Sequence, residues 1–219
     1  TRTRKGIKIG LRVFISIALI AYLIQSQDLN QIKENILKFN FFYLFLAVLA
    51  RLLGTYLASV RWNLILKTSN KEVSTLKLFA LYSKGYFYNN FLPTQMGGDV
   101  YRAVAVGSIV KDQSLGFFSV FIDRFGGLIA LLVLAFFGIA SLMGPEWVII
   151  AVVALIAGGY LYFPILRLFS KKIKFFQKFE DASNLLLENK SNAVLIIAYS
   201  FLIQIVSFAI LYLLFLGLN

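Results

Sequence analysis

The sequence contains no cysteine and no histidine among its 219 residues. This composition excludes disulfide bonds, thiolate chemistry, the usual zinc sites and a histidine general base. Cysteine usage therefore gives no information about the redox compartment, and no cofactor or metal ion is expected. Recognition by charge must rest on the arginines, lysines, aspartates and glutamates.

Acidic residues are also scarce. The chain has 10 aspartates and glutamates against 22 lysines and arginines, which gives a net charge of +12. On a soluble protein such an excess suggests nucleic-acid binding. Here most basic residues fall in the connections between apolar runs, as the positive-inside rule and attraction to anionic lipids predict. A membrane partner is therefore expected, and a nucleic-acid partner is not.

What the chain has in abundance is apolar sequence. Hydrophobic residues make up 59%, above the roughly 45–50% of soluble domains, and several runs approach the roughly 20 residues that span a bilayer. Residues 128–140 lack the alternation of a β-barrel strand. The sequence predicts an all-α, polytopic bundle of transmembrane helices. The expected helices cover residues 7–24, 41–66, 114–142, 147–166 and 193–218, with a short interfacial helix in 25–40 and a basic amphipathic helix in 171–190 on an anionic leaflet.

The two ends of the chain suggest a piece of a longer protein. The sequence begins with Thr1 rather than methionine and ends directly after an apolar run. No small-x-small cleavage pattern follows the apolar residues 13–24, so this segment is interpreted as a retained membrane helix and not as a signal peptide. We expect residues 1–219 to form a single integral membrane domain that lacks further C-terminal helices of the full-length protein.

Basic residues are concentrated in segments 2–12, 61–77 and 167–192, which are therefore predicted to be cytoplasmic together with the N-terminus. This assignment requires residues 78–110 to contribute either no crossing or two. As helices, residues 78–92 and 97–110 would measure about 22 and 21 Å, short of the roughly 30 Å of hydrocarbon. A re-entrant pair of half-helices over about 78–110 is the preferred prediction. Two short, strongly tilted spans are the alternative.

The break between these half-helices holds the first set of candidate binding residues. Pro93 ends the first half-helix because it lacks a backbone donor, and a glycine pair permits the close approach of a ligand. The second half-helix would start near Asp99 with free N–H groups that attract anions, and Arg102 is suited to bidentate phosphate binding. The candidate substrate-binding residues here are Asn89, Asn90, Pro93, Thr94, Gly97, Gly98, Asp99 and Arg102.

A purely structural interpretation of the same residues is the alternative. Asp99 would then cap its helix and form a local pair with Arg102. Asn89 and Asn90 would only satisfy the opened backbone. The functional interpretation is preferred because many polar groups converge at one membrane depth.

Charged residues inside the predicted helices form the second set of candidates. Asp123 and Arg124 lie about ten residues into an apolar helix and point about 100° apart, so they cannot both serve one partner. One of them is expected to pair with Asp99 or Arg102 across the site, and snorkelling at the interface is the alternative. Arg51 is expected to face the bundle interior, in a functional role or in a structural hydrogen bond to carbonyl groups of another helix.

These residues carry a resemblance to a known family. Residues 89–93 together with 97–102 resemble the signature of the lysylphosphatidylglycerol synthase transmembrane family, the flippase-like integral membrane proteins. Residues 123–128 resemble its acidic-Arg-x-x-Gly-Leu element, and Arg61-Trp62 resembles its Arg-Trp near the end of the second helix. The resemblance implies an inner-membrane protein of a bacterium or archaeon. It adds Arg61 to the possible site residues.

The resemblance implies movement of a phospholipid or a lipid-linked phosphate between leaflets. The ligand would dock at the glycine pair, with Arg102 and Arg124 as counter-charges. The alternatives are a membrane enzyme or accessory subunit acting on lipid-linked sugars or modified phospholipids, and a structural module that recruits partners. This chain contains no soluble aminoacyltransferase domain, so enzymatic activity is not the favoured prediction. The expected partners are an anionic or aminoacylated phospholipid or a lipid-linked phosphate, a second copy of the chain, or a separate synthase.

Overall fold

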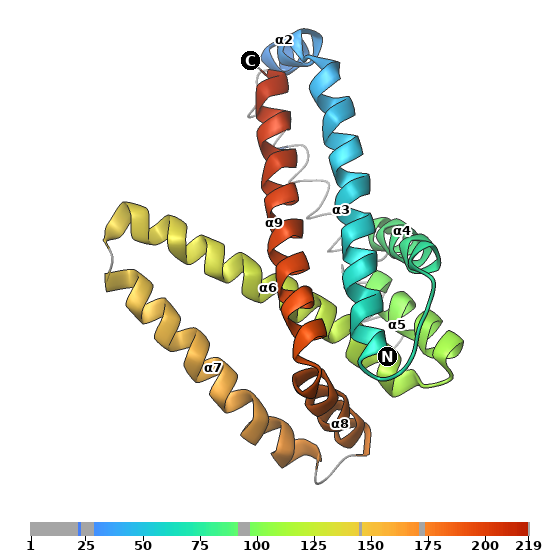
Figure 1. The fold of residues 1–219 in the computed structure, drawn as a ribbon. Helices are drawn as coiled ribbons and strands as arrows, with labels where there is room; N and C mark the ends of the chain where they lie inside the picture. Colours follow the sequence, from blue (N-terminus) through green and yellow to red (C-terminus); the bar gives the residue numbers. More distant parts are fainter. Residues whose placement is uncertain (1–21, 23–28, 92–96, 145, 171–173, 219) are drawn as a thin grey trace, which may run out of the picture. The chain divides into compact units, whose positions relative to one another are not determined.

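The computed structural model describes residues 22, 29–91, 97–144, 146–170 and 174–218 (Figure 1). These residues form helices joined by short connections, and no strand occurs among them. The helices are α2 (Leu29–Lys38), α3 (Phe41–Lys67), α4 (Thr75–Phe91), α5 (Gly97–Val110), α6 (Gln113–Met143), α7 (Glu146–Ser170), α8 (Lys174–Glu188) and α9 (Lys190–Leu218). The all-α prediction is confirmed.

Each described helix matches an expected apolar or amphipathic segment, with ends that differ by a few residues. Three of the described helices, α3, α6 and α9, are long and apolar enough to cross a membrane. The protein is thus a helical membrane protein. The crossing predicted for residues 147–166 and the re-entrant path of 78–110 stay predictions. The helix expected at 7–24 and the break itself, with Pro93 and Thr94, lie outside the described residues.

The chain divides into two compact units. The smaller unit consists of residues 1–47 and 211–219. Within it, the side chain of Asn40 accepts a hydrogen bond from the backbone N–H of Phe42 (3.1 Å), which caps the start of α3. The N–H of Asn40 donates to the carbonyl of Gly217 (2.8 Å), so the start of α3 is tied to the end of α9.

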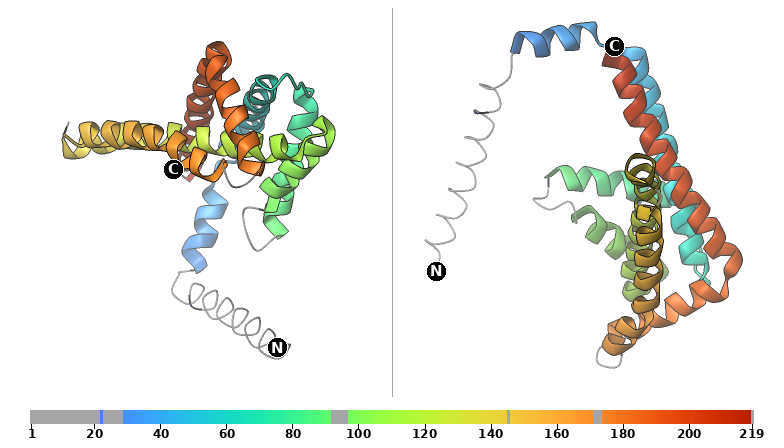
Figure 2. Two further views of the ribbon diagram at one scale, coloured as in Figure 1. Left: turned by 90° about the horizontal axis from the view of Figure 1, so that it is seen from below. Right: turned by 90° about the vertical axis from the view of Figure 1, so that its left-hand side faces the viewer.

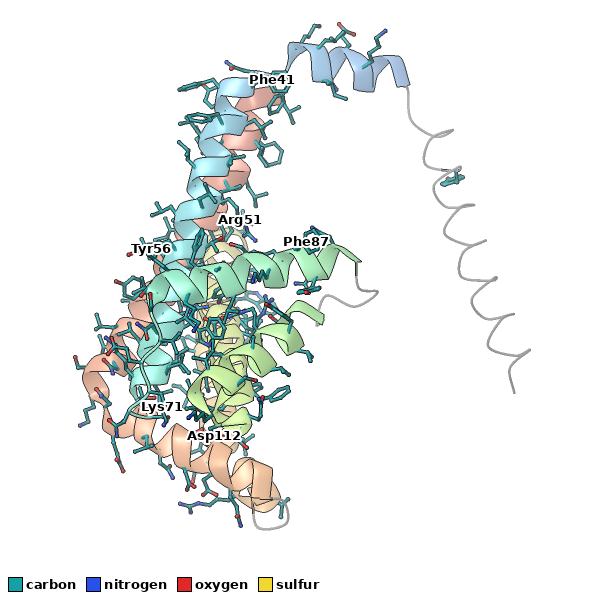
Figure 3. All side chains as sticks on the ribbon, turned by 90° about the vertical axis from the view of Figure 1, so that its right-hand side faces the viewer. Phe41, Arg51, Tyr56, Lys71, Phe87 and Asp112 are labelled. Carbon is teal, nitrogen blue, oxygen red and sulfur yellow. The ribbon has the colours of Figure 1, made fainter. Side chains whose placement is uncertain are left out.

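The larger unit, residues 48–210, contains the candidate site. In it α4 and α5 lie beside each other and run in opposite directions (Figure 2, right, and Figure 3), and α6 packs against α5. The start of α5 lies against the end of α4, because Gly98 contacts Gly85 and Asn89. In the same way the middle of α5 meets the first half of α6, where Gly116 lies against Gly107. This arrangement is compatible with a re-entrant pair and with two tilted spans.

The connection between α5 and α6 explains the tight turn of that second pair. Lys111 adopts the left-handed conformation (φ 58°) that commonly ends a helix. Asp112 then caps α6, since its carboxylate accepts from the N–H of Leu115 (3.1 Å) and its carbonyl accepts from the N–H of Gly116 (3.0 Å). The polar connection between α5 and α6 therefore turns the chain through backbone geometry and capping.

The apolar core of the larger unit lies where α3, α4, α5 and α6 meet. Trp62, Leu78, Val106 and Phe118 are fully buried there, and each comes from a different one of these helices. The indole N–H of Trp62 donates to the hydroxyl of Ser119 (2.9 Å), so its polar atom is satisfied. This core fixes the rotation of the helices whose charged residues form the site.

Candidate functional site

The centre of the site is Asp123, a carboxylate on α6 with a side chain only 1% exposed. Arg61 of α3 donates to Oδ1 from Nε (3.0 Å) and Nη2 (2.8 Å). Arg102 of α5 donates to Oδ2 from Nη2 (2.9 Å), and the Tyr82 hydroxyl of α4 donates to the same oxygen. Both carboxylate oxygens are thus fully used by side chains of three other helices. Such satisfaction is what makes a buried charge tolerable.

Arg61 extends this network to the last described helix. Besides the Asp123 carboxylate, its guanidinium donates to the backbone carbonyl of Asp123 (2.8 Å) and to the hydroxyl of Ser200 on α9 (2.9 Å). Its side chain is 6% exposed. One guanidinium therefore links α3, α6 and α9, the three helices that are apolar enough to span a membrane.

Arg102 is held between two aromatic rings. Its guanidinium carbon lies 3.4 Å from the ring centroid of Tyr82 and 4.3 Å from that of Trp62, and these rings meet edge to face. Such cation–π contacts gain strength when the cation is removed from water. Its Nη1 reaches Asp99 at a longer 3.3 Å, and its Nε has no hydrogen-bond partner although it is buried.

The outer end of the site is the pair of Asp99 and Arg124. Arg124 of α6 donates to the two Asp99 oxygens from Nε and Nη2, each at 2.8 Å, in the bidentate geometry that arginine forms with carboxylates and phosphates. The Asp99 side chain is 22% exposed and that of Arg124 is 52% exposed. The cluster thus runs from a sealed centre at Asp123 to an accessible end at Arg124.

Asn89 and Gly98 close the helix pair that carries Arg102. The Asn89 side chain accepts from the N–H of Gly98 (2.7 Å), so it satisfies the first turn of α5. A side chain on Gly98 would collide with the backbone carbonyl of Gly85. The close approach that Gly98 permits is therefore one between two helices, and a ligand contact at Gly98 stays a prediction. The capping role is taken by Asn89, while the Asp99 carboxylate pairs with arginines.

Gly98→Ala is expected to destabilise the protein by roughly 1–3 kcal/mol or more, because a methyl group cannot share space with the Gly85 carbonyl. Thermal unfolding in detergent, followed by circular dichroism, measures the change. Gly158→Ala in α7 is the matched control, since nothing lies within 4 Å of its added methyl group. Equal melting temperatures for the two variants would contradict the close packing of α4 and α5.

The structure thus brings five of the predicted charged residues into one cluster. Asp123 and Arg124 serve different partners, as their angular separation predicts. Arg51 stands apart, with its guanidinium carbon 4.4 Å from the ring centroid of Tyr86 (Figure 3 labels Arg51). The clustered charges are Arg61, Asp99, Arg102, Asp123 and Arg124.

Sequence reasoning missed three uncharged members of the site. No role in the site was predicted for Tyr82, yet its hydroxyl binds Asp123 and its ring covers Arg102. Ser200 carried no signal in a largely apolar helix, although a hydroxyl in such a helix is a potential partner for a charge. Trp62 was named only because Arg61-Trp62 resembles the Arg-Trp of the family, and no contact with Arg102 was predicted for it.

The charges of the cluster do not cancel. Three arginines and two aspartates take part in its ion pairs, which leaves one positive charge in excess within the described residues. Uncompensated charge among membrane helices is costly and is usually tied to function. The exposed end at Arg124 is where an external anion has access.

Buried ion pairs in apolar helices define the class of this molecule as an integral membrane protein with a charged site inside its helical core. Residues 9–219 match the model of the lysylphosphatidylglycerol synthase TM region, and the chain belongs to that family. It is also 26% identical over 124 residues to the UPF0104 membrane protein MJ1595 of Methanocaldococcus jannaschii, a match that covers 56% of this chain and 36% of that protein. The chain thus spans about a third of that relative's length. No solved structure matches the sequence.

Proposed function

We propose that the chain binds a phospholipid, or a lipid-linked phosphate, through its phosphate group and moves it between the leaflets of the membrane. The observation that carries the proposal is the excess positive charge of the cluster, which reaches the surface at Arg124. Family membership supports a role in the membrane biology of phospholipids. An anionic headgroup supplies the negative charge that the cluster lacks.

The buried and the exposed residues of the cluster are assigned different roles. Arg61, Arg102 and Asp123 are nearly inaccessible, with side chains 6%, 2% and 1% exposed. Their role is to fix the helices and the local potential, so the expected headgroup contact moves from Arg102 to Arg124. Arg51, whose side chain is exposed, adds positive charge on α3.

The neutral residues of the break remain part of the proposed site. Asn90 and Gly97 lie at the facing ends of α4 and α5, beside the Asn89–Gly98 hydrogen bond. Pro93 and Thr94 belong to the connection between these ends. We assign to this rim the amide and backbone groups that would orient a headgroup at the start of α5.

Binding and transport explain the site better than catalysis. A membrane enzyme acting on lipid-linked sugars would need a general base. Both carboxylates of the cluster are already engaged, Asp123 by three side chains and Asp99 by two arginines. The carboxylate oxygens hold arginine side chains in place.

The setting proposed for this activity is the cytoplasmic (inner) membrane of a bacterium or archaeon, with the N-terminus in the cytoplasm. The excess of basic residues in three predicted cytoplasmic segments supports this orientation. A second copy of the chain or a separate synthase would be the protein partner. Vesicles that contain only the purified chain test transport without a separate synthase.

Arg124→Ala is expected to reduce transport of phosphatidylglycerol by about tenfold or more, since a charge-assisted contact contributes roughly 1.5–3 kcal/mol. The measurement uses vesicles of phosphatidylglycerol and phosphatidylethanolamine that contain a trace of fluorescent phosphatidylglycerol. Quenching from outside reports the fraction of labelled lipid that reaches the outer leaflet. Stability should change by about 1 kcal/mol or less, because the Arg124 side chain is half exposed.

Lys67→Ala is the matched control for Arg124→Ala. Lys67 also forms an exposed ion pair, with Glu72 at 2.9 Å, but it lies outside the cluster. The control should move lipid at the parent rate. If Arg124→Ala is folded and transports like the parent, Arg124 does not hold the headgroup. If the parent itself moves no labelled lipid, the transport proposal fails.

A further inference from the structure

Asp99 occupies the position that an anionic ligand of Arg124 would take. Its two oxygens receive Nε and Nη2 of Arg124, each at 2.8 Å, and Oδ1 also receives Nη1 of Arg102 at 3.3 Å. The arginine fork fits the oxygens of a carboxylate and those of a phosphate equally well. The contacts that Asp99 makes are therefore those that a phosphodiester would make at the same place.

The two aspartates of the cluster differ in how easily they can be replaced. Asp123 is 1% exposed and receives hydrogen bonds from three side chains on three helices. Asp99 is 22% exposed, and its main partner, Arg124, is 52% exposed. An incoming anion can reach Arg124 without opening the core, whereas it cannot reach the arginines around Asp123.

Arg102 keeps donor capacity that the protein does not use. Its contact with Asp99 is the longest ion pair of the cluster, and its Nε is buried without a partner. Of the side-chain nitrogen and oxygen atoms that the structure describes, only this Nε and the Ser69 hydroxyl are buried and unsatisfied. A buried donor without an acceptor is costly. Asp99 is therefore bound less tightly by the buried Arg102 than by the exposed Arg124.

Asp99 can also leave Arg124 without losing all stabilisation. It lies in the first turn of α5, where a carboxylate interacts favourably with the free N–H groups and the helix dipole. A released Asp99 would remain partly accessible to solvent. The exchange moves one negative charge away from Arg124 as another arrives, so Arg124 stays paired with an anion throughout.

We infer that Asp99 is a built-in competitor that fills the anion site until the phosphodiester group of a lipid displaces it from Arg124. This inference rests on the proposed function and names the step by which the ligand binds. A resident carboxylate keeps Arg124 paired when no lipid is bound. It also weakens lipid binding, and a transport site requires weak binding because the lipid must leave again.

Asp99→Asn tests the inference. Asparagine keeps the shape of aspartate, but it removes the competing charge. The assay is a titration of the detergent-solubilised chain with spin-labelled phosphatidylglycerol. Asp99→Asn is expected to bind the probe at least fivefold more tightly than the parent. Asp99→Ser, which also removes the charge, takes its place if the asparagine variant does not fold.

Two further variants complete the design. Glu72→Gln is the matched control, because it removes a carboxylate from the exposed pair with Lys67 and should leave the affinity unchanged. Combining Asp99→Asn with Arg124→Ala should abolish the gain. Inorganic phosphate in 100-fold excess should not displace the probe, and displacement would overturn the assignment to a lipid headgroup.

The outcomes separate the two proposals. If Arg124→Ala weakens binding but Asp99→Asn binds equally or more weakly than the parent, Asp99 is not a competitor, and the lipid site stands. A gain in the Asp99→Asn variant that persists without Arg124 also overturns the inference. If neither the parent nor Asp99→Asn binds the probe, the proposed function fails together with it.

Discussion

Replacing Asp123 by asparagine is expected to destabilise the protein by about 3–5 kcal/mol or to prevent folding, because two buried arginines would lose their shared counter-charge. Asparagine has the size of aspartate, so the loss measures charge and not volume. Its amide would also place N–H donors opposite arginine donors. Unfolding by denaturant in detergent micelles, followed by circular dichroism, gives the change.

Glu72→Gln provides the contrast for Asp123→Asn. Glu72 forms an ion pair of similar length with Lys67, but both side chains are exposed, at 69% and 43%. Its loss should change stability by about 1 kcal/mol or less. A similar small change for Asp123→Asn would mean that Arg61 and Arg102 are not held by this carboxylate.

The second large effect is expected at Arg102. Arg102→Ala should cost about 3–5 kcal/mol, because it leaves a void between two rings and removes a partner of the buried Asp123. Arg102→Lys should recover only about half of this loss. A lysine can approach one carboxylate, but it cannot present the planar fork that reaches Asp99 and Asp123 together.

The same unfolding measurement shows whether Arg102 stabilises the protein by its charge alone or by contacting Asp99 and Asp123 together. If Arg102→Lys is as stable as the parent, only the charge matters and the fork is incidental. If lysine and alanine are equally destabilising, the geometry carries the whole effect. Lipid transport by the folded lysine variant then shows whether the bridge between the two aspartates also shapes the binding site.

The helices of this fold could be predicted because the membrane imposes their length. Runs near 20 apolar residues predicted α3, α6 and α9 to within a few residues. The division between α4 and α5 was predictable from Pro93 and the following glycines, since neither residue type continues a helix readily. Five of the charged residues predicted for the site lie in one cluster, and their role in binding a ligand stays a prediction.

The partners within the site could not be predicted from the sequence. Arg61 and Asp123 are 62 positions apart, and their meeting depends on how α3 and α6 rotate and pack. Sequence spacing predicts that Arg102 lies near Asp99, but it does not reveal that Tyr82 and Trp62 enclose the guanidinium. For that reason both Arg102 and Arg124 were assigned to the ligand, whereas the structure buries Arg102 and exposes Arg124.

The position of Asp123 along the chain has a consequence for biosynthesis. A ribosome makes Arg61 and Arg102 well before it makes the carboxylate that neutralises both, and the delay from Arg102 is 21 residues. Until α6 emerges, the nascent chain through α5 holds two arginines without that carboxylate. We therefore expect a chain truncated before Asp123 to fold less stably, because Arg61 and Arg102 would lack the carboxylate that pairs with both of them.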